Sequence, residues 1–169
     1  EISCSLVGSE MCIRDRCAGD MDLTIQNGGV TGHGEYTYGL YVYALDTDGN
    51  GSADTPCDNV TVTLNHVDLD VTDQGLGVQG INSNNNLVVK DSTVNAATAI
   101  YFPPKSGGLT IENSVITGVD NAIVIKGGTV DISGADTVIR ATGPADEIDT
   151  PYEGDPNDPD SFPHSGSAV

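Results

Sequence analysis

Residues 109–116 read Leu-Thr-Ile-Glu-Asn-Ser-Val-Ile, and residues 120–125 read Asp-Asn-Ala-Ile-Val-Ile. In the first stretch, apolar Leu109 and Ile111 alternate with polar residues, a period of two that is typical of a half-buried β-strand. The second stretch is a short apolar run that follows a few residues later. No sustained helical spacing of apolar residues is present, so the unit predicts short strands and no helix.

The same unit recurs along the chain, which predicts a repeat architecture. Aligned segments begin at Leu23, Val62, Leu87, Leu109 and Val130. Four of them continue to a further apolar residue, namely Val30, Leu69, Val94 and Ile116, and then to a second strand that begins at Gly39, Gly75, Ala99 or Ala122. The last three steps are 25, 22 and 21 residues long, whereas the first step of 39 residues carries an insertion.

These repeats are too short for crossover helices, and their alternation differs from the continuous apolar runs of parallel strands that are covered on both faces. A solenoid satisfies both facts, with equivalent strands stacked in parallel about 4.8 Å apart. The pattern, from about residue 22 to residue 142, resembles the right-handed parallel β-helix superfamily, which includes pectate-lyase-like enzymes, phage tailspikes and bacterial surface proteins. The resemblance implies an all-β, right-handed parallel β-helix of about five coils. It says little about function, because this scaffold carries both enzymes and inert stalks.

Alternation predicts two inward columns of aliphatic side chains. The first is Leu23, Val62, Leu87, Leu109 and Val130, and the second is Ile25, Leu64, Val89, Ile111 and Ile132. Asn27 and Asn113 fall at matching turn positions, where they either form a ladder of amides or serve as turn residues that tolerate the left-handed region. Outward Lys90 and Glu112 occupy one column of adjacent coils and are candidates for an exposed ion pair.

The two ends of the chain differ from this pattern. Residues 1–16 have no strand or helix period, and the string SLVGSEMCIRDR at 5–16 resembles translated sequencing-adapter read-through. We interpret 1–16 as a non-native segment that replaces the true start and any export signal, with a genuine short N-terminal strand as the alternative. Residues 17–143 are the predicted β-helix, with an acidic insertion at 44–59. Residues 144–169 hold five Pro, seven acidic and no basic residues, which predicts a disordered acidic tail or linker; a loop that packs back on the helix is the alternative.

Charge excludes several classes of partner. The chain of 169 residues has 25 acidic and 6 basic side chains and a net charge of −19. Nucleic-acid binding requires Lys and Arg that displace counterions from phosphates, and anionic lipid repels an acidic surface. No apolar run reaches about 18 residues, so we expect no membrane span.

The insertion contains the strongest candidate for a metal site. Its sequence 46–54, Asp-Thr-Asp-Gly-Asn-Gly-Ser-Ala-Asp, resembles the acidic calcium loops of thrombospondin type-3 and dockerin-like repeats. Calcium requires several oxygen ligands, and the candidates are Asp46, Asp48, Asn50, Ser52, Asp54 and Asp58. Where such loops end in an acidic residue this chain has Cys57, and Asp58 follows one place late, so we expect a weak structural site with Kd of about 10⁻⁴–10⁻³ M. The alternative is a polar turn, because Asp-Gly and Asn-Gly are strong turn signals.

Evidence for catalysis is thin. Gly32-His-Gly34 resembles an element of polygalacturonases, but the Asn-Thr-Asp and Asp-Asp elements that supply acid–base catalysis in that family are absent. We interpret His33 as a turn residue and predict no catalytic residue. Lyases of this fold use an Arg or Lys base, and the only Arg after residue 16 is Arg140. A disulfide between Cys17 and Cys57 would suit an exported protein, and two free thiols are the alternative.

The sequence therefore predicts a non-catalytic fragment of a secreted or cell-surface bacterial protein. Its solenoid would act as a stalk or as an adhesive surface for a carbohydrate or a host-cell ligand, braced by calcium at one loop. Two alternatives stay open. One is a fragment of a polysaccharide lyase or glycoside hydrolase whose active-site coils lie elsewhere. The other is a carbohydrate-binding or tailspike-like module, which would be expected to trimerise.

Overall fold

A computed structural model describes residues 5–6, 13–17, 21–34, 37–44, 58–78 and 84–143. Within those ranges every regular element is a β-strand, and no helix there is long and apolar enough to cross a membrane. The strands are β1 (Ser5–Leu6), β2 (Ile13–Cys17), β3 (Met21–Gly32), β4 (Tyr38–Ala44), β5 (Val60–Val71), β6 (Gln74–Val78), β7 (Asn84–Lys90), β8 (Thr93–Phe102), β9 (Ser106–Glu112), β10 (Val115–Ile125), β11 (Thr129–Ser133) and β12 (Val138–Ala141).

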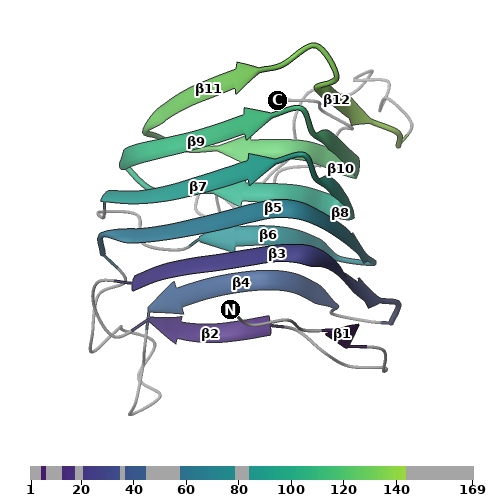
Figure 1. Ribbon diagram of the computed structural model, residues 1–169, viewed down its shortest axis with the longest axis horizontal. Coiled ribbons are helices and arrows are strands. Elements are labelled where there is room, and N and C mark those ends of the chain that lie inside the picture. Colours follow the sequence, from purple (N-terminus) through teal and green to yellow (C-terminus); the bar gives the residue numbers. More distant parts are fainter. Residues whose placement is uncertain are drawn as a thin grey trace, which may run out of the picture.

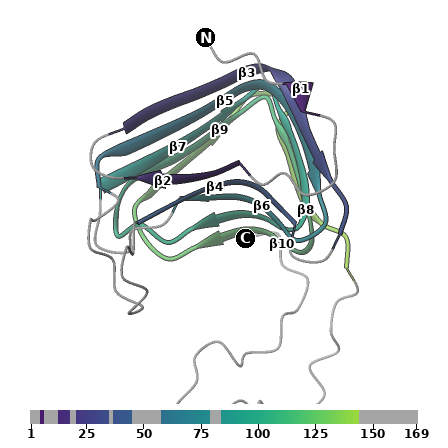
Figure 2. The same ribbon diagram turned by 90° about the horizontal axis from the view of Figure 1, so that it is seen from below.

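The strands pair in parallel and wind around one core as three faces (Figures 1 and 2). Face A consists of residues 21–26 of β3, 60–65 of β5, and β7, β9 and β11. Face B consists of residues 28–32 of β3, 67–71 of β5, 93–96 of β8, 115–118 of β10, and β12. Face C consists of β2, β4, β6, residues 98–102 of β8 and 121–125 of β10.

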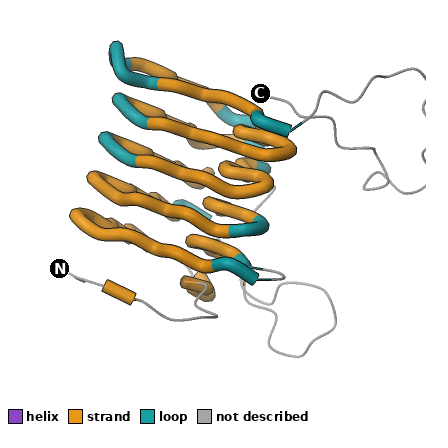
Figure 3. The backbone as a smooth tube through the Cα atoms, turned by 90° about the vertical axis from the view of Figure 1, so that its right-hand side faces the viewer, coloured by secondary structure: helices purple, strands orange, loops and turns teal. Residues whose placement is uncertain are grey.

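The arrangement is a parallel β-solenoid of about three turns, with its coils stacked one on the next (Figure 3). The predicted all-β solenoid is therefore confirmed at the level of the fold. The count of five coils stays a prediction, because the connections through 45–57 and 79–83 lie outside the described residues. The right hand of the coil also stays a prediction.

The register of both predicted inward columns is confirmed. Along face A, the paired residues of successive strands are Ile25, Leu64, Val89, Ile111 and Ile132, each of which pairs with the next. The middle three side chains are at most 1% exposed, because each lies between the equivalent side chains of the coils on either side. The neighbouring column from Leu23 to Val130 follows the same register.

Burial fails at the last coil. Val130 is 41% exposed and Ile132 is 42% exposed, so the prediction that they are core residues is wrong. Strand β11 pairs with β9 on one side and with no described strand on the other. Stacking buries a side chain only when coils cover it from both directions, and this condition is not met at the end of the described solenoid.

The corner between faces A and B is a left-handed turn in successive coils. Asn27, His66, Asp91 and Asn113 occupy equivalent positions, and their φ angles are 55°, 54°, 47° and 46°. Asn and Asp reach this region at lower cost than most residues. Asn27 and Asn113 are therefore left-handed turn residues. A continuous amide ladder is excluded here, since His66 and Asp91 stand between them.

Immediately after this corner, two buried serines connect neighbouring coils. The hydroxyl of Ser92 accepts a hydrogen bond from the backbone N–H of Val67 at 3.0 Å, and the hydroxyl of Ser114 accepts one from the N–H of Ser92 at 3.1 Å. Ser92 is 5% exposed and Ser114 is 1% exposed. A buried N–H without a partner costs about 1–3 kcal/mol, so the serines make the sharp corner compatible with a dry interior.

The predictions for the two ends of the chain, residues 1–16 and 144–169, compare differently with the structure. Two strands fall within residues 1–16 or at their boundary, and the backbone of β1 pairs with β3 while that of β2 pairs with β4. Backbone pairing here agrees with the alternative of a genuine short N-terminal strand, and the interpretation of residues 1–16 as non-native stays a prediction. The acidic tail predicted at 144–169 lies outside the described residues.

Two isoleucines of one column provide a matched test of the stacked core. Ile111→Ala should lower the free energy of unfolding by about 2–5 kcal/mol, because Ile111 is fully buried between Val89 and Ile132. Ile132→Ala should cost much less, since its side chain is 42% exposed. Urea unfolding followed by circular dichroism measures both. Equal losses for the two variants would contradict a core centred on the middle coils.

Candidate functional site

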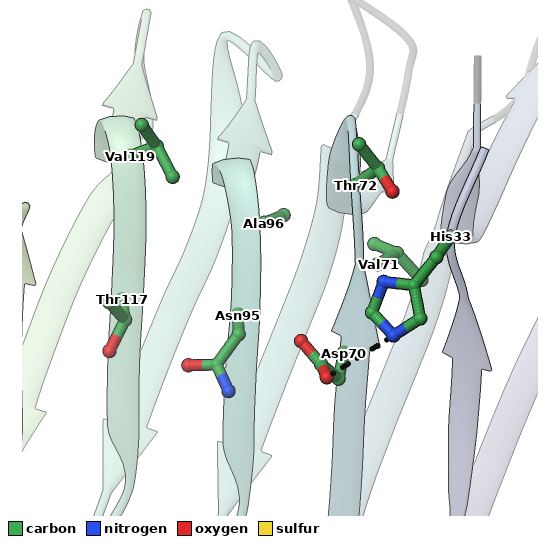
Figure 4. A pocket seen from close by; sticks show the side chains of 8 residues that line it. All are labelled: His33, Asp70, Val71, Thr72, Asn95, Ala96, Thr117 and Val119. Carbon is green, nitrogen blue, oxygen red and sulfur yellow. Dashed lines mark ion pairs between the residues drawn. The ribbon is translucent and has the colours of Figure 1, made fainter. Parts of the chain in front are cut away.

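A shallow trough crosses the outer side of face B near its edge with face C. It has a volume of about 350 Å³ and is open to solvent. Figure 4 shows that its lining comes from neighbouring strands of successive coils. The lining residues are His33, Asp70, Val71, Thr72, Asn95, Ala96, Thr117 and Val119. We refer to this depression as the face-B trough.

Strand alternation explains the polar side of the trough. Asp70, Asn95 and Thr117 pair with one another in register, and each follows a buried residue of the inward column. The side chains of successive strand residues point to opposite faces, so these three point outward. Parallel stacking places them about 4.8 Å apart along the solenoid axis. This column therefore contributes one polar side chain per coil to the trough.

Apart from Thr72, the other side of the trough is apolar. Val71 and Ala96 are 4% and 6% exposed, whereas Val119 is 50% exposed. Val119 lies where the register between β8 and β10 shifts, just after Gly118. This irregularity lifts an apolar side chain into solvent at the edge of the face. The trough thus combines hydroxyl, amide and carboxylate groups on one side with aliphatic groups on the other.

His33 and Asp70 face each other at one end of the trough. Nε2 of His33 lies 3.7 Å from Oδ2 of Asp70, and their side chains are 63% and 53% exposed. That separation exceeds a normal hydrogen bond, and water screens an exposed pair of this kind. His33 directly follows β3, and the N–H of Gly34 donates to the Thr72 hydroxyl at 3.2 Å. The pair can offer polar contacts to a ligand at the surface.

Sequence reasoning overlooked the polar residues of the trough. Their signal was available, because Thr31, Asp70, Asn95 and Thr117 each follow the aligned apolar residue of their repeat. Arg140 extends the same column, and its Nε donates to the Thr117 hydroxyl at 3.0 Å. The Gly32-His-Gly34 element, through which the sequence drew attention to His33, gave no indication of the other polar residues of the trough.

The predicted calcium site lies almost entirely outside the described residues. This applies to Asp46, Asp48, Asn50, Ser52 and Asp54. Asp58 is described, and its Oδ1 accepts hydrogen bonds from the backbone N–H groups of Asn59 and Asn84, each at 2.9 Å. Among the described residues, no three His, Cys, Asp or Glu side chains could together hold a metal ion. Cys57 also lies outside, so the bridge to Cys17 stays a prediction.

Face A carries the predicted ion pair, which the structure confirms. Lys90 Nζ lies 2.9 Å from Glu112 Oε2, across the paired strands β7 and β9. The pKa of Lys90 is raised, first because Glu112 accepts a hydrogen bond from the ammonium group and second because the carboxylate charge favours the protonated form. Desolvation opposes this rise in the pKa of Lys90, and the charge of Asp91 adds to it.

Comparisons with known proteins found no match: no family model, no curated protein and no solved structure is similar to this chain. The fold class rests on the strand pairing and the buried columns described above. On that basis the chain is a parallel β-solenoid.

The Lys90–Glu112 pair predicts that the free energy of unfolding falls at alkaline pH. Because the pKa of Lys90 is raised in the folded protein, the pair stabilises the fold fully below the pKa of an unfolded lysine. That contribution disappears as the pH rises through the raised value. Glu112→Gln should therefore lower the pKa of Lys90, as measured by NMR of its side chain. Asp131→Asn on the same face serves as the control, and an unchanged pKa in Glu112→Gln would refute the assignment.

Proposed function

We propose that this chain is a non-catalytic module of a secreted or cell-surface bacterial protein, in which the solenoid acts as a stalk or adhesive surface. The observation that carries the proposal is the unbroken internal stack. Among the described residues, twenty-three buried apolar side chains form one core cluster that spans the coils. A parallel stack of this kind makes a stiff body whose outer columns are free to vary in sequence.

The face-B trough suits contact with a ligand at the surface better than it suits chemistry. Catalytic groups generally need positions where burial or close charges tune their pKa. His33 and Asp70 are both more than half exposed and 3.7 Å apart. The half-buried side chains of Asn95 and Thr117 would supply hydrogen-bonding groups for an extended molecule that lies along the axis. An extracellular or cell-surface location is part of this proposal.

A second candidate is a fragment of a carbohydrate-active β-helix enzyme or a carbohydrate-binding module of the pectate-lyase-like superfamily, built from about five right-handed coils. The observation in its favour is the pairing of His33 with Asp70 in the trough. The acidic composition argues against polyuronate substrates, because the net charge of −19 repels them at low ionic strength.

A degradation assay separates the two candidates. The full chain is incubated with polygalacturonate, pectin and xylan, and reducing ends and the absorbance of unsaturated products are followed. The non-catalytic proposal predicts no product above a heat-denatured control. Product that accumulates, and that is lost in Asp70→Asn but kept in Asp131→Asn, would overturn it and place acid–base chemistry in the trough.

The proposal includes one structural calcium ion in the insertion. Since Asp58 Oδ1 already accepts two backbone hydrogen bonds, the ligands would come chiefly from the loop at 46–54. Calorimetric titration should detect binding with Kd of about 10⁻⁴–10⁻³ M. Asp48→Asn should weaken it, whereas Asp68→Asn on face B should not. The absence of heat at millimolar calcium would eliminate the ion from the proposal.

A further inference from the structure

The outer side of face C carries tyrosines that are not part of the buried core. In register along this face, Tyr41 pairs with Gly77, Gly77 with Tyr101, and Tyr101 with Val124. The residues flanking the two tyrosines are buried, so both rings point away from the core and are only half-buried. Parallel stacking places this column along the solenoid axis, perpendicular to the strands.

Gly77 creates the space in which the Tyr41 ring lies. A Cβ atom built on Gly77 would come within 2.2 Å of Cε2 and 2.4 Å of Cδ2 of Tyr41. The ring therefore crosses from its own coil onto the next, and it covers the strand where no side chain intervenes. The Tyr38 ring lies beside it, with a centroid separation of 5.7 Å and an angle of 58° between planes.

These residues lie along one stretch of the face, which we call the face-C strip and define as Tyr38, Tyr41, Gly77 and Tyr101. It occupies three successive coils of face C. Lys126 approaches its far end, with Nζ 5.3 Å from the centroid of the Tyr101 ring. Such a contact is weak for an exposed lysine, so a ligand can displace the ammonium group from the ring.

The neighbouring column consists of uncharged polar residues. Tyr38 pairs with Gln74, Gln74 with Thr98, and Thr98 with Asn121, and all of these are half-buried. Amide and hydroxyl groups both donate and accept hydrogen bonds. Face C thus presents aromatic rings and neutral hydrogen-bonding groups side by side, repeated along the axis.

The combination of aromatic rings and neutral polar groups indicates which kind of ligand would fit face C. Tyrosine supplies rigid contact area that is apolar on the ring and polar at the hydroxyl. A protein partner typically buries about 800 Å² of surface on each side of its interface. A strip one residue across offers less area than that. A polyanion would be repelled by the net charge of −19. A linear, uncharged polysaccharide is narrow and repetitive, and it combines apolar C–H faces with hydroxyl groups.

We propose that the face-C strip binds a linear, uncharged glycan that lies along the solenoid axis, with sugar rings packed on Tyr41 and Tyr101. The site is separate from the face-B trough. The inference goes beyond the proposed function, because a non-catalytic scaffold can exist with or without a glycan on face C. Degradation assays test the scaffold role, and binding assays test the strip.

Binding is measured with the full chain by isothermal calorimetry, using cellohexaose and xylohexaose as uncharged probes and an oligogalacturonide as the anionic one. The sequence has six Tyr and no Trp, so ultraviolet emission reports directly on tyrosine and provides a second readout. We expect at least one uncharged probe to bind at millimolar concentration or below and to change that emission. The anionic probe should bind more weakly.

Three variants locate the site. Tyr41→Ala and Tyr101→Ala should each weaken binding about tenfold or more, in line with the role of aromatic anchors in other interfaces. Gly77→Ala removes no aromatic group, but its Cβ displaces the Tyr41 ring, so it should weaken binding with little change in melting temperature. Thr63→Ala on face A is the control that should bind as the wild type does, and Asn95→Ala tests whether the ligand lies in the trough instead.

Several outcomes overturn the inference. The first is no binding of either uncharged probe at millimolar concentration, and the second is binding that survives in the Tyr41→Ala, Tyr101→Ala double variant. Loss of binding in Asn95→Ala alone would move the ligand to the trough. Preference for the oligogalacturonide would refute the argument from charge. Self-association of the chain that the double variant abolishes, without glycan binding, would make the strip a protein contact.

Discussion

The stacking of like side chains across parallel strands is the constraint on which the remaining structure depends. Val89 illustrates it: the side chain is fully buried between Leu64 and Ile111, one coil to either side. No long-range sheet order would persist without this contact, because each coil alone leaves its apolar face uncovered. The contact also requires a constant register, since a shift by one residue would turn every aliphatic side chain toward water.

Keeping that register imposes a second requirement at the corners. The chain must turn sharply between faces, and the turns bring backbone N–H groups into the interior. Buried polar side chains satisfy them: Ser92 and Ser114 serve one corner, and at another the buried Asn85 accepts from the N–H of Val60 at 2.9 Å. Within the described residues, no buried side-chain nitrogen or oxygen lacks a hydrogen-bond partner. These few polar groups therefore accompany the aliphatic columns as part of the same core.

Sequence alone predicted the columns well, because a period of two and a repeat of 21–25 residues can be counted along the chain. It predicted the pairing of Lys90 with Glu112 for the same reason. It overestimated the burial of Val130 and Ile132, since alternation states which way a side chain points but not whether another coil covers it. It also overlooked Asp70, Asn95, Tyr41 and Tyr101. Each is unremarkable in its own strand, and only the alignment of coils brings it beside its counterparts.

That difference has a physical origin that also indicates where recognition can reside on such a fold. The inward columns are constrained by packing, so their composition reports the fold. The outward columns share the same spacing but have no packing constraint, so each becomes a row of side chains aligned with the axis. On face B such a row contains Asp70, Asn95 and Thr117, and on face C another row contains Tyr41 and Tyr101. An extended ligand matches such a row better than a compact ligand does, because every added coil adds one more outward position at the same spacing. The geometry that stabilises the interior therefore also favours extended molecules on the exterior.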